Sequence, residues 1–166
     1  MQLKMFKDLF STNDPDVVFT PPHIAKDMCE RFSMAGVGLD PCCGEGIFLK
    51  YLPESTEWCE IRKGVDFFDR TRPVDWIIGN PPYSIFSDWF SHSFALSNNI
   101  IYLIPINKLF GSWNKVQSVR NYGGIPTIRF YGSGRDIGFP FGFACGAVHF
   151  QKGYSGATNF EYYQSN

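Results

Sequence analysis

The sequence has few of the features that mark secreted, membrane-spanning or metal-binding proteins. It has no apolar run of membrane-spanning length, and its first residues, MQLKMFKDLF, lack the long apolar segment of a secretion signal. Its three histidines stand far apart, and none forms a Cys/His spacing typical of zinc, so we expect neither membrane nor metal binding. Its five cysteines, an odd number, indicate free thiols in a reducing compartment such as the cytoplasm.

The chain also lacks an excess of basic residues. Fifteen Lys and Arg against 16 Asp and Glu give a formal net charge of −1 and a pI near 6.3. A protein that grips DNA mainly through its phosphates usually carries a basic excess. Any contact with nucleic acid must therefore use a local patch, be weak, or depend on a partner. The scattered cations available for phosphate contacts are Lys108, Lys115, Arg120, Arg129 and Arg135.

The bulk composition suits one globular domain that spans residues 1–166. Apolar residues make up 44% of the 166 and charged residues 19%, without an obvious linker, repeat or low-complexity block. Alternating apolar segments and turns predict an α/β fold with a mostly parallel, doubly wound sheet and a late antiparallel strand. We expect strands at 36–40, 57–61, 74–79, 100–106, 127–131 and 144–151, and helices at 23–32, 47–52, after a Ser84 cap, and at 115–122.

The segment Asn80-Pro81-Pro82-Tyr83 follows a strand that we expect to be buried on both faces. The two prolines remove N–H donors, so nearby carbonyls, notably that of Pro81, are less easily satisfied by regular backbone bonding. The Asn80 side chain adds a second acceptor, and two adjacent acceptors can hold an amino group. Tyr83 offers a flat face on which a base can stack. The alternative is a rigid turn with a satisfied Asn80 and a core Tyr83.

A glycine loop, DPCCGEG, precedes this segment at residues 40–46. Asp40 stands at a predicted strand end, and Gly44 and Gly46 allow a ligand to approach the backbone closely. The helix expected next would direct its N–H groups at an anionic portion of the ligand. One glycine loop alone is a weak signal, because many nucleotide-binding folds have one.

Four motifs in order, FTPPHIA, DPCCGEG, GVDFFD and GNPPYS, make the signal specific. The chain resembles the S-adenosylmethionine-dependent adenine-specific DNA methyltransferases that act on amino groups, over roughly residues 17–150. The resemblance implies a Rossmann-like methyltransferase fold. It also implies methyl transfer to the exocyclic amino group of an adenine that is flipped out of DNA.

The same resemblance implies a role for each matched residue. Thr20 and Pro21 would border the methionine part of the cofactor, and the pocket itself would consist of Asp40, Pro41, Gly44 and Gly46. Glu60 would bind the ribose, and the cofactor adenine would contact Asp66, Phe67 and Phe86. The target base would be held by Asn80, Pro81, Pro82 and Tyr83, with Phe141, and next Phe139, as the best candidates for a second aromatic wall.

Two departures from the family pattern affect these expectations. Glu60 and Asp66 are six positions apart, so either the usual helix and strand are missing, giving a reduced sheet, or residues 61–64 form a tight turn. Little sequence remains after the last predicted strand, so we expect no separate target-recognition domain. The enzyme would then be weakly sequence-selective, or a protein partner or loops 107–115 and 132–136 would select the target. A compact enzyme of this kind fits a phage or mobile element, hence the cytoplasm of a bacterial or phage-infected cell.

Other functions remain open on the sequence alone. A methyltransferase of this type could act on RNA, on cytosine amino groups or on a protein glutamine amide, because a planar amide offers the same two donors. A non-enzymatic module that binds the cofactor or a partner is a further alternative. The intact DPCCGEG and NPPY motifs weigh against the non-enzymatic module.

Overall fold

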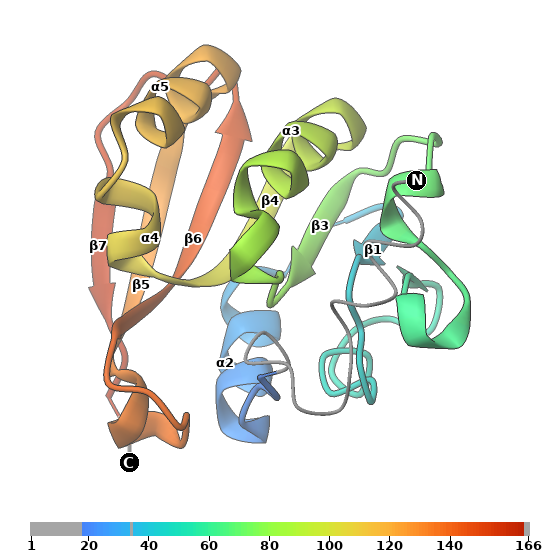
Figure 1. The fold of residues 1–166 in the computed structure, drawn as a ribbon, viewed down its shortest axis with the longest axis horizontal. Coiled ribbons are helices and arrows are strands. Elements are labelled where there is room, and N and C mark those ends of the chain that lie inside the picture. Colours follow the sequence, from blue (N-terminus) through green and yellow to red (C-terminus); the bar gives the residue numbers. More distant parts are fainter. Residues whose placement is uncertain (1–17, 34, 165–166) are drawn as a thin grey trace.

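Seven strands form one sheet in the computed structural model, which describes residues 18–33 and 35–164 (Figure 1). The sheet order is β2-β1-β3-β4-β6-β5-β7. Strands β2, β1, β3 and β4 run parallel, β6 is antiparallel to β4 and β5, and β7 is parallel to β5. This arrangement confirms the expected α/β fold with a late antiparallel strand. The bounds are β1 Gly38–Asp40, β2 Glu57–Trp58, β3 Trp76–Gly79, β4 Asn99–Pro105, β5 Gly123–Ser133, β6 Ala144–Lys152 and β7 Asn159–Tyr162.

Helices cover both faces of this sheet. The successive side chains of β4 alternate between the two faces, so each face carries apolar side chains that a helix can cover. Ile101 and Leu103 pack in one buried cluster with Ile24 and Met28 of α2. Ile100, Tyr102 and Ile104 pack in the other with residues of α3 and α5, which lie beside each other in Figure 1. The α-helices are α2 Pro22–Arg31, α3 Phe86–Leu96, α4 Ile106–Phe110 and α5 Trp113–Tyr122. In the described part of the chain, no helix is long and apolar enough to cross a membrane.

The helix expected at residues 47–52 does not form, and that prediction was wrong. Residues 44–51 are a series of turns, in which Gly46 N–H bonds Cys43 O and Tyr51 N–H bonds Phe48 O. Gly44 and Gly46 both adopt positive φ angles, of 52° and 81°, which no regular right-handed helix contains. Pro53 restricts the residues that precede it, so too few positions remain for a stable helix.

Three further differences concern the edges of predicted elements. Ser84 does not cap α3, because residues Tyr83–Ile85 form a 3₁₀ turn (η3) and the α-helix begins at Phe86. Helix α4 was not predicted, since five residues carry too little periodicity. Strand β7 was also missed, because two of its four residues, Phe160 and Tyr162, expose apolar side chains rather than burying them.

The connection between β2 and β3 resolves the short spacing of Glu60 and Asp66. Residues Ile61–Lys63 form a 3₁₀ turn (η1), and Glu60 pairs with Val65 in an isolated antiparallel bridge. A second 3₁₀ turn, η2 at Phe67–Asp69, follows. Residues 59–75 are all described and contain neither an α-helix nor a strand. The tight turn is therefore present and no α-helix or strand lies between β2 and β3, although the sheet still has seven strands.

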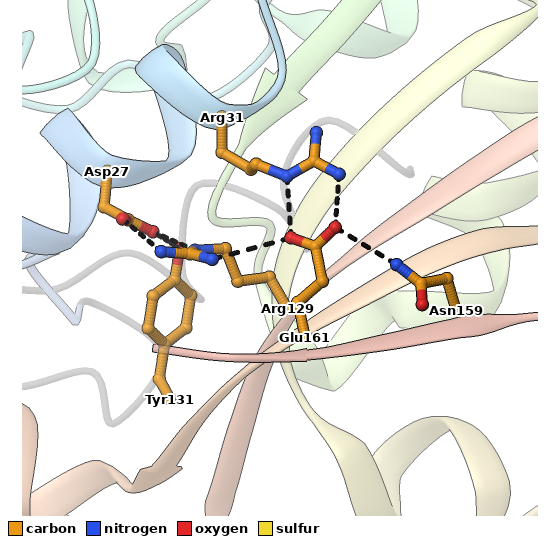
Figure 2. Close-up of polar contacts among 6 residues, drawn as sticks. All are labelled: Asp27, Arg31, Arg129, Tyr131, Asn159 and Glu161. Atoms are coloured by element: carbon orange, nitrogen blue, oxygen red, sulfur yellow. Dashed lines mark hydrogen bonds and ion pairs between the residues drawn. The ribbon is translucent and has the colours of Figure 1, made fainter. Parts of the chain in front are cut away.

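A network of charged side chains ties α2 to the late strands (Figure 2). Arg129 of β5 donates to both carboxylate oxygens of Asp27 on α2, at 2.5 and 2.7 Å. Tyr131 donates to the same carboxylate at 2.7 Å. Glu161 of β7 accepts bonds from Arg31 and Arg129, and the hydrogen bond from the Arg31 guanidinium is the main cause that lowers the Glu161 pKa. Arg129 was expected among the candidates for phosphate contacts, but its charge is already neutralised inside this network.

Replacing Asp27 with alanine should lower the free energy of unfolding by about 2 kcal/mol, because Arg129 and Tyr131 would lose their shared acceptor in a half-buried site. Urea denaturation measures the change. Lys26→Ala is the matched control on the same helix, since its ion pair with Glu30 is exposed and should contribute less than about 0.5 kcal/mol. Equal effects of the two substitutions would contradict a stabilising network.

Candidate functional site

The carboxyl ends of three neighbouring parallel strands bring the two main motifs together. Strand β1 ends at Asp40, β3 at Gly79 and β4 at Pro105. Gly79 makes the close approach possible, because a Cβ there would lie 3.1 Å from Asp40 Oδ1 and 3.5 Å from Cys42 Sγ. The Cys42 thiol donates to the Asn80 carbonyl at 3.2 Å. The glycine loop and the NPPY segment are therefore in direct contact, as expected for ligand-binding loops at this edge of an α/β sheet.

The Asn80 side chain is fixed in one orientation. Its amide nitrogen donates to the Val18 carbonyl and to Thr20 Oγ1, both at 3.2 Å. Because the two N–H groups are used, the carbonyl oxygen must lie on the opposite side of the planar amide. There it accepts a 2.6 Å hydrogen bond from the Tyr83 hydroxyl. An amide oxygen has two lone pairs, so Asn80 Oδ1 can accept a second donor from a ligand.

The rest of the NPPY segment holds Tyr83 beside Asn80. Pro81 is buried, and Pro82 has φ −65° and ψ 124°, an extended conformation that leads directly into the 3₁₀ turn of Tyr83. The Tyr83 hydroxyl also lies 3.4 Å from the Leu103 carbonyl. The ring is half-buried, so part of it is accessible for stacking. The four residues thus combine a fixed acceptor with an accessible aromatic ring.

A cavity of about 290 Å³ lies between the glycine loop and the segment before α2. Thr20, Gly44 and Asn80, which were predicted as site residues from three separate motifs, all line it. Its volume is at the lower end of the range of small-molecule sites. The complete lining is Val18, Phe19, Thr20, Pro22, Cys42, Cys43, Gly44, Glu45, Ile47, Phe48 and Asn80.

Asp40 lies beneath the glycine loop and does not line this cavity. Its side chain is fully buried, and Oδ1 accepts a 3.2 Å bond from the Cys42 N–H. Among the described residues, Oδ2 has no hydrogen-bond partner. Burial is the main cause that raises the pKa of this carboxyl to about 7. Pro41, next in the chain, is also buried, so both residues support the loop from below.

Glu60 lies against the glycine loop. Its carboxylate accepts the Gly44 N–H at 2.8 Å and two bonds from Arg62, at 3.0 and 3.1 Å. The Lys63 ammonium donates to the Gly44 carbonyl at 2.7 Å. Gly44 is therefore held on both sides by the turn after β2. This contact explains why the short Glu60–Asp66 connection matters to the site: it fixes the glycine loop.

The three residues predicted to contact the cofactor adenine do not line the 290 Å³ cavity. Asp66 caps η2 by accepting the Phe68 N–H at 2.9 Å. Phe67 is buried in the core, 4.5 Å from the Trp89 ring and 4.8 Å from the His92 ring, measured between centroids. Phe86 is also buried in that core and lines a different cavity beside Tyr83. Phe67 and Phe86 thus belong to one buried cluster, and none of the three residues lines the cavity that Asn80 lines.

The loop expected to supply a second aromatic wall lies beside the segment before α2. An added Cβ at Gly138 would lie 3.4 Å from the Pro21 ring, so this loop and Pro21 are neighbours. Phe139 is buried in the α2-side core, stacked on Phe141 at 5.0 Å between centroids. Phe141 is half-buried. Of the two, Phe141 has the more accessible ring.

Sequence reasoning missed several residues that shape the site. Cys42 links the two motifs through its thiol, and Ile47 and Phe48 form an apolar wall of the cavity. The doubled cysteine in the glycine loop was the only available signal for the thiol contact. Among the described residues, no group of three or more His, Cys, Asp or Glu side chains is placed to hold a metal ion.

The comparisons with known proteins address the fold. No protein-family model matches the chain, and no curated protein matches it by sequence. Solved structures match along its length. The M protein of the type I restriction enzyme EcoKI aligns with a TM-score of 0.63 at 14% identity, over 91% of this chain and 47% of that chain. The fold is that of a methyltransferase.

Two further structures agree with this methyltransferase fold. A modification subunit of a proposed type I restriction enzyme from Vibrio vulnificus has a TM-score of 0.61 at 14% identity, over 97% of this chain and 50% of that chain. A proposed RNA methyltransferase from Pyrococcus horikoshii has a TM-score of 0.62 at 14% identity, over 90% and 93%. The chain spans about half the length of the type I modification subunits that it matches.

Proposed function

We propose that this chain transfers a methyl group from S-adenosylmethionine to the exocyclic amino group of adenine in DNA. The observation that carries the proposal is the fixed Asn80 amide, whose N–H groups are bonded to Val18 and Thr20 and whose oxygen lies beside Tyr83. That pairing of an oriented acceptor with an aromatic ring suits a planar ligand that bears an amino group. The methyltransferase fold, shared with type I modification subunits, supports it.

The residues around the 290 Å³ cavity fit the methionine end of this cofactor. Gly44 and Gly46 adopt positive φ angles and leave the loop backbone uncovered by side chains. Ile47 and Phe48 provide an apolar wall, and Thr20 and Asn80 provide polar groups. Beneath the loop, the unpartnered carboxyl oxygen of Asp40 is a latent negative charge that a nearby cationic group would stabilise. When bound, the cofactor supplies an electrophilic methyl group on a positively charged sulfur.

Asn80 and the NPPY backbone would activate the accepting nitrogen. The lone pair of the adenine amino group is delocalised into its ring, which makes that nitrogen a weak nucleophile. A hydrogen bond from the amino group to Asn80 Oδ1, with a second to the Pro81 carbonyl, would stabilise the positive charge that develops on nitrogen. The Asn80 oxygen is preorganised for this role because Val18 and Thr20 hold its amide plane.

Tyr83 would position the base rather than move protons. Its ring would stack on the adenine, and Phe141 would close the opposite side of the base. A base within a duplex cannot reach the site, so the target must be flipped out or already single-stranded. The methyl group would pass to the amino nitrogen with release of one proton from that nitrogen to solvent, and correct placement of the nitrogen would supply much of the rate enhancement.

Tyr83→Phe and Tyr83→Ala should separate stacking from hydrogen bonding. Phenylalanine keeps the ring but loses the 2.6 Å bond to Asn80, so we expect methyl transfer to fall about tenfold. Alanine also removes the ring, and we expect at least about a hundredfold loss. Single-turnover methyl transfer measures both. If Tyr83→Phe loses as much methyl-transfer activity as Tyr83→Ala, the ring does not hold the base.

The enzyme would be weakly sequence-selective, or its target sequence would be selected by a protein partner or by loops 107–115 and 132–136. The type I modification subunits with this fold belong to restriction enzymes of several subunits, which is why a protein partner is part of the proposal.

A panel of acceptors tests the proposal. Purified protein is incubated with tritiated S-adenosylmethionine and unmethylated DNA, RNA of the same sequence, or a glutamine-containing peptide. We expect the label in DNA and none in the peptide. RNA is the second candidate acceptor, because the proposed RNA methyltransferase from Pyrococcus horikoshii matches over 93% of its own length. Label in RNA alone would replace the DNA proposal, and no label with no cofactor binding by calorimetry would indicate a non-enzymatic module.

A further inference from the structure

A second cavity, of about 160 Å³, is lined by Tyr83, whose hydroxyl bonds the side chain of Asn80, a residue that lines the 290 Å³ cavity. Its lining combines residues that begin α3 with one residue from α5, Lys115. Figure 1 shows α3 and α5 beside each other, with α4 below α5 at the end of the sheet where β4 finishes. The lining residues are Tyr83, Ser84, Ile85, Phe86, Ser87, Asp88 and Lys115.

The Lys115 ammonium is held in this cavity without an acidic partner. It lies 4.9 Å from the centroid of the Phe86 ring and donates to the Lys108 carbonyl at 2.9 Å. Among the described residues, no carboxylate lies within 4.0 Å of it, although the exposed Asp88 lines the same cavity. Burial, and secondly the positive charge of Lys108, lowers the pKa of Lys115. Lys115 is therefore a cation that lines this cavity without an ion pair among the described residues.

Two of the other candidates for phosphate contacts, Arg129 and Arg120, lie in different surroundings. Arg129 is paired with Asp27 and Glu161. Arg120 lines a separate cavity with Gly123 and Gly124. The segment from Lys108 to Lys115 also exposes two aromatic side chains, Phe110 at 47% and Trp113 at 66%. Cations interleaved with exposed aromatic rings are typical of surfaces that bind nucleic-acid strands.

We propose that Lys115 and Lys108 bind the DNA backbone phosphate next to the target base. This inference rests on the proposed function, because it takes the base to be held against Tyr83. A phosphate at this position would neutralise the Lys115 ammonium, which would keep its contact with the Phe86 ring, and the exposed Lys108 side chain extends from the residue whose carbonyl Lys115 bonds. The site would fix the strand on which the base is flipped and would not read its sequence, since phosphates carry no sequence information.

Lys115 also has a possible structural role, because its ammonium bonds a carbonyl at the end of α4. Lys108 separates the two roles. Only its backbone carbonyl takes part in that bond, and its side chain is exposed, so Lys108→Gln leaves the fold undisturbed. Lys152 is the matched control, because it is exposed at the end of β6, beside Asn98 near the amino end of β4, whereas the proposed site lies near the carboxyl end of β4.

The experiment measures binding of a fluorescein-labelled unmethylated duplex between 50 and 200 mM salt by wild type, Lys115→Gln, Lys108→Gln, Lys115→Arg and Lys152→Gln. We expect the glutamine variants at 108 and 115 each to reduce the slope of log K against log salt by about one. Their KM for DNA should rise about five- to tenfold, with kcat at saturating DNA and cofactor affinity within about twofold of wild type. Lys115→Arg should restore the slope, and Lys152→Gln should not change it.

Each alternative result has a distinct meaning. Wild-type slopes for both Lys108→Gln and Lys115→Gln, in a protein that methylates DNA, would overturn this inference and leave the proposed function standing. A wild-type protein that neither binds nor methylates DNA would overturn both. A loss confined to Lys115→Gln, with a lower melting temperature and an unchanged salt slope, would assign Lys115 a structural role only.

Discussion

Asn80→Ala should reduce methyl transfer to DNA by about 10²–10³-fold while cofactor affinity stays within about threefold. The substitution removes the oxygen that would accept the adenine amino group, and it removes the side-chain contact to Tyr83. The cavity retains its glycine loop and its apolar wall, so the cofactor loses little. Single-turnover rates with saturating cofactor, together with calorimetric cofactor affinity, measure the two effects separately.

Thr20→Val provides the matched control for Asn80→Ala. It removes one of the two bonds that orient the Asn80 amide but keeps the Asn80 oxygen itself. We expect a loss of about tenfold, the size of one positioning hydrogen bond. If Asn80→Ala keeps the full rate of transfer, the role of Asn80 as the acceptor for the amino group is wrong. If both variants lose activity equally, Asn80 acts only by holding residues 18–20.

Asp40→Asn should stabilise the protein at neutral pH, by about 2 kcal/mol. Burial raises the pKa of Asp40 to about 7, from the 3.8 of an ordinary Asp. Between these two values the folded protein holds a proton that the unfolded chain has released. The free energy of unfolding of the wild type therefore falls as the pH rises from about 4 to 7, and it levels off above 7. Asparagine has no such titration, although its buried amide offsets part of the gain.

Urea denaturation at pH 4 to 8 tests this prediction. The difference in unfolding free energy between Asp40→Asn and wild type should grow with pH and reach its maximum above pH 7. A difference that does not change with pH would show that the Asp40 carboxyl is not destabilised by burial. We also expect weaker cofactor binding in the variant, because the latent negative charge beneath the glycine loop is lost. Substitutions that stabilise a protein at a functional site commonly reduce its function.

Strong local patterns made the centre of the fold predictable. The continuous apolar runs that became β3 and β4 have side chains buried on both faces, so their sequence signal was unambiguous. The glycine loop was placed correctly, but the helix after it was not. The apolar residues after the loop lie in a series of turns, and Phe48 packs in the core without helical periodicity. Strand β7 pairs along the sheet edge by backbone bonds and carries little pattern of its own.

The motifs that form the site could be predicted from the sequence, but the contacts between their side chains could not. Thr20, Gly44 and Asn80 come from three motifs, and the strand order brings them to one cavity. The orientation of Asn80 depends on Val18 and Thr20, which lie about 60 residues earlier in the chain, so no local pattern encodes it. Phe67 and Phe86 illustrate a different limit, because an aromatic residue in a motif can equally fill a core, and here both are buried.

The most direct test of the central claim is the identity of the methylated product. Unmethylated genomic DNA is incubated with the protein and tritiated S-adenosylmethionine, digested to nucleosides and separated by chromatography. The account predicts that the label elutes as N6-methyldeoxyadenosine and disappears with Asn80→Ala. Label in a methylated cytosine, or a protein that binds the cofactor but labels no nucleoside, would contradict the account.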